Sequence, residues 1–548
     1  MSMYNSLDFE SISRTTVIAC TATFGLAIAG LIRSYSKTKN AQGLPLPPGP
    51  RPLPFIGNAL DIKPDEPWTS YTQWGAKYGD LVYSRVLSLD IIVINSEDVA
   101  KELLDKRSHN YSDRPLWPVN QLFGLSLISA LLPYGDVWRL HRRILHQAFR
   151  PAIAASYVPI QVRKSRELLL NLYDSPEHYE EHVKSFPASI IMSIVYGYEA
   201  AQCNDPLVAI VDKAAEAVTQ IVSPGRAAVL ASFPVLMRLP TWVPNMLYKN
   251  AVTTSRQRMT EMQDIPFNYT REQMAAGTAV NGAVYDALSK LGGENRSEVG
   301  TADDSEAMTE AIKGAAATAF LAGAETTTST LFNFILAMIL YPDVQRRAQR
   351  EIDSVCGTNR LPVLEDKDSL PFIEAIVRET LRWHPVLPLE EAKVTDIQYA
   401  DYWMRLGLAH ATTNDDVYQG YFIPKGTTII ANTWAMSRDE TKYPNASDFV
   451  PERWLTADGG LIDDIPDFVF GFGRRFCVGK PLAEASLWLG VASLLAVFSF
   501  CKPDSGEEYE PKWTFGAASR PFPFPCRVTP RSADLSREKL VQLVHADA

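Results

Sequence analysis

A cysteine in a loop rich in glycine and arginine constrains this chain most. The loop reads FGFGRRFCVG over residues 470–479, so Cys477 has glycines on both sides and two arginines just before it. The apolar run from Lys480 to Phe498 has a proline in its first turn, and this pattern predicts a helix. Cys477 therefore precedes a predicted helix N-terminus, where the helix dipole and the arginines favour a thiolate. Such a thiolate is a soft metal ligand or a nucleophile, and the glycines leave room for a large flat group.

The simplest interpretation of a single cysteine is a buried structural residue. Here, however, five positions match the pattern F-x-x-G-x-R-x-C-x-G, namely Phe470, Gly473, Arg475, Cys477 and Gly479. In this pattern the chain resembles the cytochrome P-450 family of haem-thiolate monooxygenases. The resemblance implies that Cys477 is the axial ligand of the iron of haem b, and that the other four residues contact this cofactor.

Composition bounds the class of protein. The 548 residues suffice for one large domain or two to four ordinary ones, and 46% of them are hydrophobic, enough for a large core. The formal net charge of -10 argues against nucleic acid as a partner, since nucleic-acid-binding proteins usually have a basic face. Six cysteines without closely paired spacing do not form a disulfide framework, which favours a reducing compartment.

An uncharged segment near the N-terminus predicts a membrane anchor. Residues 15–32 contain no charged side chain, and a segment of this length is at the short end for a membrane span. A cleaved signal peptide is the alternative, but Asp8 and Glu10 precede the segment, where a signal peptide needs basic residues. Arg33 and Lys37 follow it, so the positive-inside rule places the rest of the chain in the cytosol. We therefore predict a single-pass anchor, and the resemblance implies that it lies in the endoplasmic reticulum membrane.

A proline-rich stretch, Leu44–Pro52, follows this segment and predicts a stiff spacer that cannot join a helix. We predict two parts: residues 1–40 as an N-terminal segment with the anchor at about residues 15–32, and residues 41–548 as the haem-binding catalytic domain. The resemblance covers about residues 41–530 and implies a mainly α fold with small β sheets, the fold of the haem-thiolate family.

Trp138 and Arg142 are spaced i and i+4 in a basic helical stretch, so they share one face of the helix. Without other evidence, this pattern is more often a solvated basic face with a tryptophan in the core. In the resembled family a W-x-x-x-R pair contacts a haem propionate, and arginine suits a carboxylate because its fork donates two hydrogen bonds. The resemblance thus implies that both residues bind the cofactor.

The apolar stretch over residues 307–340 predicts a long helix through the protein core. A membrane span is unfavourable here, because Glu325 would be costly inside a bilayer. The sequence AGAETT, which starts at Ala322, matches the oxygen-activation motif of the family. The resemblance implies that Ala322 and Gly323 lie against the haem. Thr326 can bond the backbone carbonyl four residues back, and the resemblance implies that its hydroxyl holds water near the bound oxygen. Glu325 would then relay protons from solvent.

Glu379 and Arg382 match the pattern E-x-x-R on a predicted amphipathic helix. Such a pair is usually a surface ion pair worth at most ~1 kcal/mol. The resemblance implies that Arg453 is the third member of a buried cluster that fixes the scaffold behind the cysteine loop. Loss of one member would then leave a buried charge unpaired and cost roughly 3–5 kcal/mol.

The chain departs from the family pattern before a β hairpin predicted over residues 411–430. The insertion Glu390 to Gly407 has no counterpart in the pattern, and long structureless loops are uncommon in compact domains. Two interpretations are equally open: a real surface loop, whose length costs little entropy, or a translated non-coding sequence. His410 falls where the family often has a basic residue that binds a propionate, but the insertion leaves its register undefined.

These motifs together predict a monooxygenase that hydroxylates a small apolar substrate with O2. The resemblance implies electrons from NADPH through a flavoprotein reductase, and it is strongest to fungal microsomal members that act in secondary metabolism or xenobiotic oxidation. The alternatives are a haem-thiolate isomerase or dehydratase, or a non-catalytic haem-binding membrane protein if the insertion is real and disruptive. Four basic residues form a candidate docking patch for the reductase, with solvated charge as an equal alternative: Arg139, Arg143, Arg474 and Lys480.

Overall fold

The computed structural model describes residues 43–545 except for residues 55, 64–65, 116–117, 203, 222–246, 293–301, 390–407, 504–509 and 515–517. The chain divides into two compact units. The smaller unit combines Met1–Pro47 with Asn414–Lys425, and the larger unit combines Pro48–Thr413 with Gly426–Ala548. The predicted anchor, the predicted domain boundary near residue 40 and the insertion Glu390 to Gly407 lie outside the described residues.

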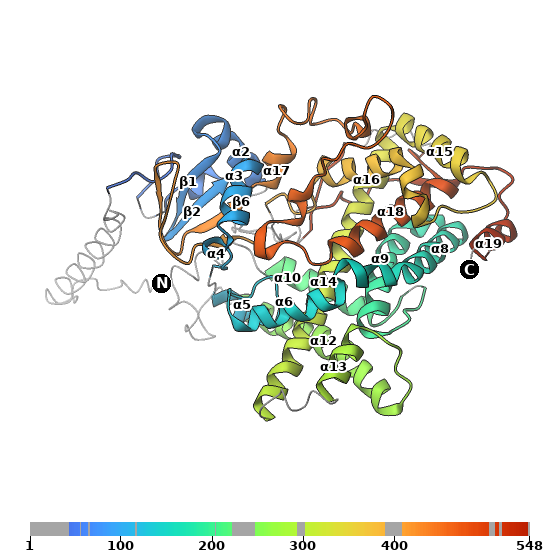
Figure 1. Ribbon diagram of the computed structural model, residues 1–548, viewed down its shortest axis with the longest axis horizontal. Helices are drawn as coiled ribbons and strands as arrows, with labels where there is room; N and C mark the ends of the chain where they lie inside the picture. Colours follow the sequence, from blue (N-terminus) through green and yellow to red (C-terminus); the bar gives the residue numbers. More distant parts are fainter. Residues whose placement is uncertain are drawn as a thin grey trace, which may run out of the picture. The chain divides into compact units, whose positions relative to one another are not determined.

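Helices form most of the larger unit, which confirms the predicted mainly α fold with small sheets (Figure 1). Several helices begin with a proline, which lacks the N–H that would have no partner there. The α-helices are α2 Pro67–Tyr78, α3 Glu97–Ala100, α4 Ser108–Tyr111, α5 Pro118–Leu122, α6 Asp136–Phe149, α7 Pro151–Ala154, α8 Val158–Asp174, α9 Tyr179–Tyr196, α10 Val208–Ile221, α12 Leu247–Ala276, α13 Ala283–Gly292, α14 Ala302–Leu340, α15 Pro342–Cys356, α16 Pro371–Trp383, α17 Thr433–Ser437, α18 Lys480–Val497 and α19 Arg537–His545.

Short helical turns complete the helical part of the larger unit. One of them, η3, is a π-helix over Lys101–Lys106 that continues α3. The others are 3-10 turns: η2 Ala59–Asp61, η4 Ala155–Tyr157, η5 Pro176–His178, η8 Leu364–Ser369, η9 Pro451–Trp454, η10 Asp467–Phe470 and η11 Gly473–Arg475. The last two shape the loop that carries Cys477.

The helix α14 runs through the core of the larger unit. Its 39 residues span about 58 Å at 1.5 Å per residue. It packs against α6, α9, α12 and α18, and all side chains from Leu331 to Met338 are nearly fully buried. A core helix is what the sequence predicts, but α14 begins five residues before the predicted residue 307. The acidic Asp304 and Glu306 explain the earlier start, because negative charge stabilises the first turns of a helix.

A four-stranded sheet has the strand order β1–β2–β6–β3. Strands β1 Leu81–Val86 and β2 Leu89–Ile94 are rich in β-branched and apolar residues and form an antiparallel pair. Strand β6, Thr428–Ala431, pairs parallel with β2, and β3, His410–Ala411, pairs antiparallel with β6. Strands β3 and β6 both follow the insertion in sequence. They therefore complete a sheet whose first strand begins some 330 residues earlier.

Two further hairpins lie in different units. In the smaller unit, β4 Asp416–Tyr418 and β5 Tyr421–Ile423 form a hairpin within the predicted range. They meet at Gln419 and Gly420, whose φ angles of 49° and 80° fit a tight hairpin turn. In the larger unit, β7 Phe498–Cys501 pairs antiparallel with β8 Arg527–Pro530. Between β7 and β8 lies a long connection, whose described part includes Trp513 and Ser519.

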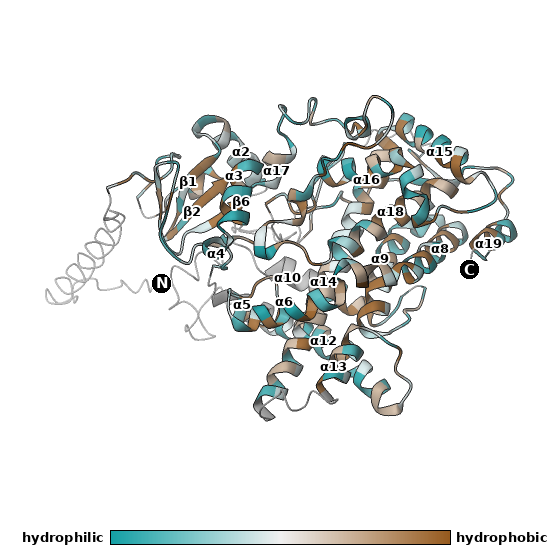
Figure 2. Cartoon of the chain, viewed as in Figure 1, coloured by the Kyte–Doolittle hydropathy of each residue, from teal (hydrophilic) through white to brown (hydrophobic). Residues whose placement is uncertain are grey.

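Among the described residues, α18 is the one helix that is long and apolar enough to cross a membrane. However, 67% of this segment is buried inside the protein, where it packs against α8, α14, α15 and α16. Its apolar composition therefore matches its position in the core, as it does for the hydrophobic strands β1 and β2 (Figure 2).

The predicted ion cluster is present and buried. Glu379 and Arg382 on α16 are fully buried and joined by two hydrogen bonds of 2.7 and 2.9 Å. Arg453 in η9 donates from Nε to Glu379 at 3.1 Å, and the indole N–H of Trp454 donates to the same carboxylate at 2.9 Å. Because the backbone N–H of Val450 adds a further bond of 2.8 Å, Glu379 fixes the segment before the cysteine loop onto α16.

Candidate active site

A cavity of about 300 Å³ lies inside the larger unit. The middle of α14 and the cysteine loop, residues 470–479, both contribute to its wall, together with α6 and α9. A cavity of this size is at the lower end of the range for small-molecule and cofactor sites. Much of the lining is apolar and comes from Leu145, Phe149, Pro187, Ile190, Ile191, Ala319, Val386, Leu387, Leu408 and Leu482.

Cys477 reaches the cavity from the loop that leads into α18. The backbone N–H of Cys477 donates to the carbonyl oxygen of Phe470 at 2.8 Å, which closes the loop. The cysteine side chain is accessible only because it borders the cavity, and it lies deep beneath the protein surface. Its predicted place just before a helix is confirmed, because α18 begins at Lys480 with Gly479 as its N-cap.

The two predicted glycines of this loop make different contacts. Gly473 has a φ of 55°, and a Cβ atom there would lie 2.0 Å from the carbonyl oxygen of Leu104, so no larger residue fits. Gly473 is not among the described residues that line the cavity. The close backbone of Leu104 explains why position 473 needs a glycine. Gly479 and Phe470 do line the cavity, and a Cβ at Gly479 would be 3.9 Å from the Cys477 sulfur.

The acidity of Cys477 differs from the expectation. The backbone N–H groups of Gly479 and Lys480 and the guanidinium of Arg142 each lower the pKa of the thiol, as the predicted helix N-terminus requires. Burial acts more strongly in the opposite direction, so the pKa of Cys477 in the protein alone lies above its ordinary value. The expected thiolate is therefore not favoured by the loop itself. The arginine that lowers the pKa of Cys477 is Arg142 of α6, and not one of the two arginines of the loop.

The oxygen motif lies on the cavity side of α14. Ala322, Gly323 and Thr326 all line the cavity. Thr326 donates its hydroxyl hydrogen to the carbonyl oxygen of Ala322 at 2.8 Å, the backbone bond predicted from the sequence. A Cβ at Gly323 would lie 2.6 Å from the side chain of Ile191, so this glycine also allows α9 to pack closely on α14.

Glu325 differs from its neighbour Thr326 in its position relative to the cavity. It is not among the described residues that line the cavity, and its side chain is half-buried. Burial raises the pKa of this carboxyl, and the charge of Asp212 raises it further. Arg520 and Lys184 act in the opposite direction, so Glu325 lies in a field of charges from three other segments. The predicted solvent-to-cavity path therefore would have to pass around α14.

Three arginines border the cavity. Arg142 lies with Trp138 on one face of α6, as predicted, and both line the cavity. Arg475 from the cysteine loop stacks its guanidinium 4.4 Å from the centre of the Trp138 ring. The third, Arg114, was not predicted. It follows α4 in an irregular segment, and its position before Pro115 indicates only an extended backbone.

The surroundings of Arg475 fit an anionic group. Its Nε and Nη2 atoms donate to the carbonyl oxygens of Ser112 and Leu132, both at 2.8 Å. Its Nη1 atom is buried without a hydrogen-bond partner in the described structure. Burial and the charges of Arg114 and Arg142 lower the pKa of Arg475 to about 8, which the nearby Asp113 only partly offsets. Carboxylates bound in the cavity would supply the missing acceptors and relieve the repulsion among the arginines.

Two buried histidines have structural surroundings. His410 on β3 lies with Nδ1 2.6 Å from the carbonyl oxygen of Tyr111, and burial holds its pKa well below the usual range. It is not among the described residues that line the cavity, and Arg114 takes up the position at the cavity wall. His384 forms the C-cap of α16 and stacks on Trp513, with the ring centres 4.4 Å apart.

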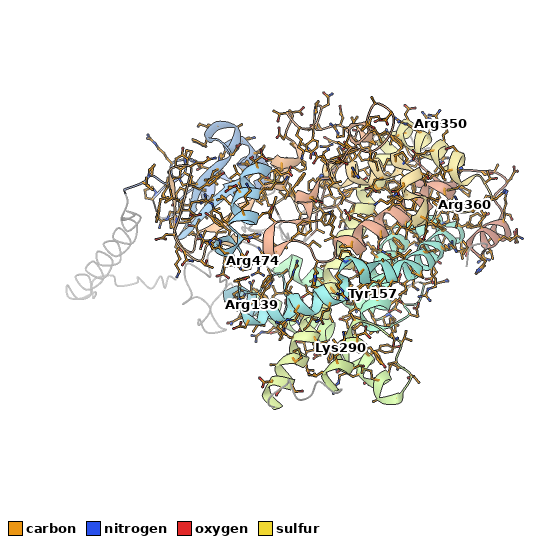
Figure 3. All side chains as sticks on the ribbon, in the orientation of Figure 1. Arg139, Tyr157, Lys290, Arg350, Arg360 and Arg474 are labelled. Atoms are coloured by element: carbon orange, nitrogen blue, oxygen red, sulfur yellow. The ribbon has the colours of Figure 1, made fainter. Side chains whose placement is uncertain are left out.

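The four basic residues of the candidate docking patch are arranged unequally. Arg139 and Arg474 lie close together (Figure 3), and each guanidinium is 5.4 Å from the ring centre of Tyr134. Arg143 is exposed on α6. Lys480, in contrast, is paired with Asp467 at 2.6 Å and with Glu484 at 3.5 Å. Arg139 also pairs with the exposed Asp136.

Comparison with known proteins adds an independent line of evidence. The profile of the family described as Cytochrome P450 matches residues 47–524. The chain is 36% identical to cytochrome P450 monooxygenase ple1 of Rhodocybe pseudopiperita, over 94% of each sequence. It is 35% identical to cytochrome P450 monooxygenase claR of Ampulloclitocybe clavipes, over 95% of this chain and 92% of that protein. It is 37% identical to cytochrome P450 monooxygenase COX1 of Coprinopsis cinerea, over 87% and 90% of the two chains.

A mainly helical protein in which a cysteine loop and an oxygen-motif helix border one arginine-lined cavity has the arrangement of a haem-thiolate protein. With the matching profile and relatives of this identity and coverage, the chain belongs to the cytochrome P-450 family. It is an oxidoreductase of the monooxygenase type, and the three relatives named above are fungal. Members of this family bind haem b through a cysteine thiolate, react with small molecules and receive electrons from a redox partner.

Proposed function

We propose that Cys477 would hold the iron of haem b and that Thr326 would act on the reaction from the α14 wall of the same cavity. The observation that carries this proposal is the shared cavity, which Cys477 borders from the loop before α18 and Thr326 from the middle of α14. Bound haem supplies an iron that accepts the thiolate as a ligand and reacts with O2. Trp138, Arg142 and Arg475, with Arg114 as an addition, are the residues that would hold the haem carboxylates.

The polar groups of α14 handle protons in this proposal. The Thr326 hydroxyl, which donates to the carbonyl oxygen of Ala322, can turn its hydrogen towards the cavity and return it to the helix. Thr327 and Thr330 also line the cavity, and they give water further acceptors and donors beside Thr326. The carboxyl of Glu325, whose pKa burial raises, is the titratable group next to Thr326 in sequence and can exchange protons with water. Thr326 is thus the group that touches the reacting atoms, and Glu325 is its proton source.

The substrate we propose is a small apolar molecule. Apart from the arginines and threonines described above, the cavity wall is made mostly of leucine, isoleucine, valine, phenylalanine and alanine side chains. Its further hydroxyl groups are those of Ser129, Thr318 and Ser486. An apolar wall favours a molecule that loses little hydration on entry, and it excludes water from the reacting centre. We propose that this substrate belongs to fungal secondary metabolism or xenobiotic oxidation.

Electrons, in our proposal, come from NADPH through a flavoprotein reductase. The exposed arginines around Tyr134, namely Arg139 and Arg474, with Arg143 on the same helix as Arg139, support a docking site for an acidic partner. The uncharged segment at residues 15–32 supports anchorage in the endoplasmic reticulum membrane with the catalytic part in the cytosol.

The proposed reaction is tested by oxygen labelling. The full chain is co-expressed with a fungal flavoprotein reductase, and membranes are incubated with NADPH, 18O2 and a panel of apolar small molecules. Hydroxylation predicts a product that contains one atom of 18O and forms only with NADPH. A rearranged or dehydrated product without 18O would contradict the monooxygenase reaction and favour an isomerase or dehydratase. The variant Cys477→Ser, processed in parallel, identifies background activity of the host.

A further inference from the structure

Hydrogen bonds and a ring stack connect α14 with two segments that are distant in sequence. Asn333 on α14 is fully buried, and its amide is used at both ends. Its Oδ1 atom accepts a hydrogen bond of 3.1 Å from the indole N–H of Trp513, and its Nδ2 atom donates to the carbonyl oxygen of His384 at 3.0 Å. Asn333 thus holds the connection between β7 and β8 and the end of α16 against the same helix.

The second link joins His384 to that connection. The imidazole of His384 stacks on Trp513 with ring centres 4.4 Å apart and an interplanar angle of 13°. Its Nε2 atom lies 2.9 Å from the hydroxyl oxygen of Ser519. Burial and the nearby Arg438 hold the pKa of His384 well below its ordinary value, so the ring stays neutral and the stack is not disturbed by charge.

The third link reaches the cavity wall. The backbone N–H of Ser519 donates to the carbonyl oxygen of Val386 at 2.7 Å. Val386 and Leu387 line the cavity, whereas Asn333, Trp513 and Ser519 do not. These three residues, together with His384, form what we call the Asn333 latch. The latch therefore contacts the wall formed by Val386 and Leu387 without lining the cavity itself.

The position of the latch gives it a role beyond packing. Asn333 lies seven residues after Thr326, two turns along α14 and on the same face of the helix. The latch thus links the wall formed by Val386 and Leu387 to the helix that carries the oxygen motif. The bonds of Asn333 to His384 and of His384 to Ser519 are buried, and the bond from Trp513 to Asn333 is part-buried. A buried polar group without its partner is unfavourable, so these bonds favour one position of the wall.

We propose that the Asn333 latch positions the Val386–Leu387 wall relative to α14 and thereby determines which bulky molecules reach the cavity beside Thr326. Its members are positioning residues, since they act on substrate only through Val386 and Leu387. The inference rests on the proposed haem site and adds a selectivity determinant outside the cavity lining.

The test uses two ligands that bind haem iron through a ring nitrogen, imidazole and 4-phenylimidazole. The purified full chain is titrated with each, and the dissociation constants are measured from the absorption change of the haem. The variant Trp513→Phe keeps a ring for the stack but removes the N–H group that Asn333 accepts. We expect imidazole affinity within about twofold of wild type and a change of about fivefold for 4-phenylimidazole, as for loss of one buried hydrogen bond.

Two further variants make the result specific. Ser519→Ala removes the partner of His384 at the other end of the latch, and it is expected to change the ratio of the two dissociation constants in the same direction. Tyr179→Phe is the matched control, because it removes a buried bond of 2.7 Å to Phe524 in the same C-terminal segment without any link to Val386.

A wild-type ratio in both latch variants, with the haem intact, would overturn the proposal. So would an equal change in Tyr179→Phe, since it would show a general loosening of this segment. Failure of wild-type protein to respond to imidazole at all would instead reject haem binding, and with it the proposed function.

Discussion

Glu379 should be among the most costly residues of this protein to neutralise. The change Glu379→Gln keeps the size of the side chain, so it creates no cavity. It removes the negative charge that pairs with Arg382, which is fully buried, and with Arg453, which is 9% exposed. Because two guanidinium groups then lack a counter-charge in the interior, we expect a loss of roughly 3–5 kcal/mol.

The chain provides a control of the same chemistry on the surface. Glu452 and Arg347 form an ion pair of 2.6 Å, but their side chains are 46% and 44% exposed. For an exposed pair we expect Glu452→Gln to cost at most about 1 kcal/mol. The contrast between the two variants thus isolates burial, since the substitution is identical.

The assay is unfolding by urea, followed by far-ultraviolet circular dichroism of the full chain. Glu379→Gln is expected to unfold at a clearly lower urea concentration than wild type, while Glu452→Gln unfolds near the wild-type midpoint. Equal midpoints for Glu379→Gln and Glu452→Gln would refute the reasoning that the buried cluster holds the segment behind the cysteine loop.

Two other predictions concern proton transfer and pH. Thr326→Ala should lower the product formed per NADPH consumed at least about tenfold, while Thr309→Ala, which removes an equivalent backbone bond on α14 away from the cavity, should leave this ratio unchanged. Burial lowers the pKa of His141 to about 4, so the unfolded chain takes up a proton there below pH 6.5 that the folded chain does not. The free energy of unfolding therefore falls by about 2 kcal/mol between pH 7 and pH 5 because of His141. The melting temperature of wild type should fall more than that of His141→Gln between pH 7 and pH 5, and a parallel fall would contradict this.

Features that depend on a local sequence pattern were predicted correctly. The start of α18 directly after the cysteine loop follows from glycine and proline at neighbouring positions, and the bond from Thr326 to Ala322 follows from helix geometry. The buried contacts of Glu379 were predicted from a family motif and are present. In each case either spacing along one element or a shared motif fixes the contact.

Contacts that depend on long-range packing were not predictable in the same way. Arg114 borders the cavity because the segment after α4 reaches residues nearly 300 positions later, where it donates to the carbonyl oxygens of Leu408 and Ala409. Trp513 meets Asn333 across 180 residues. The direction of the Cys477 pKa was also missed, because burial depends on everything packed around the loop and outweighs the local N–H groups.

The identity of the iron ligand is the central claim, and one spectrum tests it most directly. The full chain is reduced under carbon monoxide, alongside Cys477→Ser and the control Cys356→Ser, which alters a buried cysteine outside the cavity lining. A thiolate ligand predicts a red-shifted Soret band in wild type and in Cys356→Ser, and its loss in Cys477→Ser. A haem-containing wild type without that band, or a Cys477→Ser variant that retains it, would contradict Cys477 as the ligand.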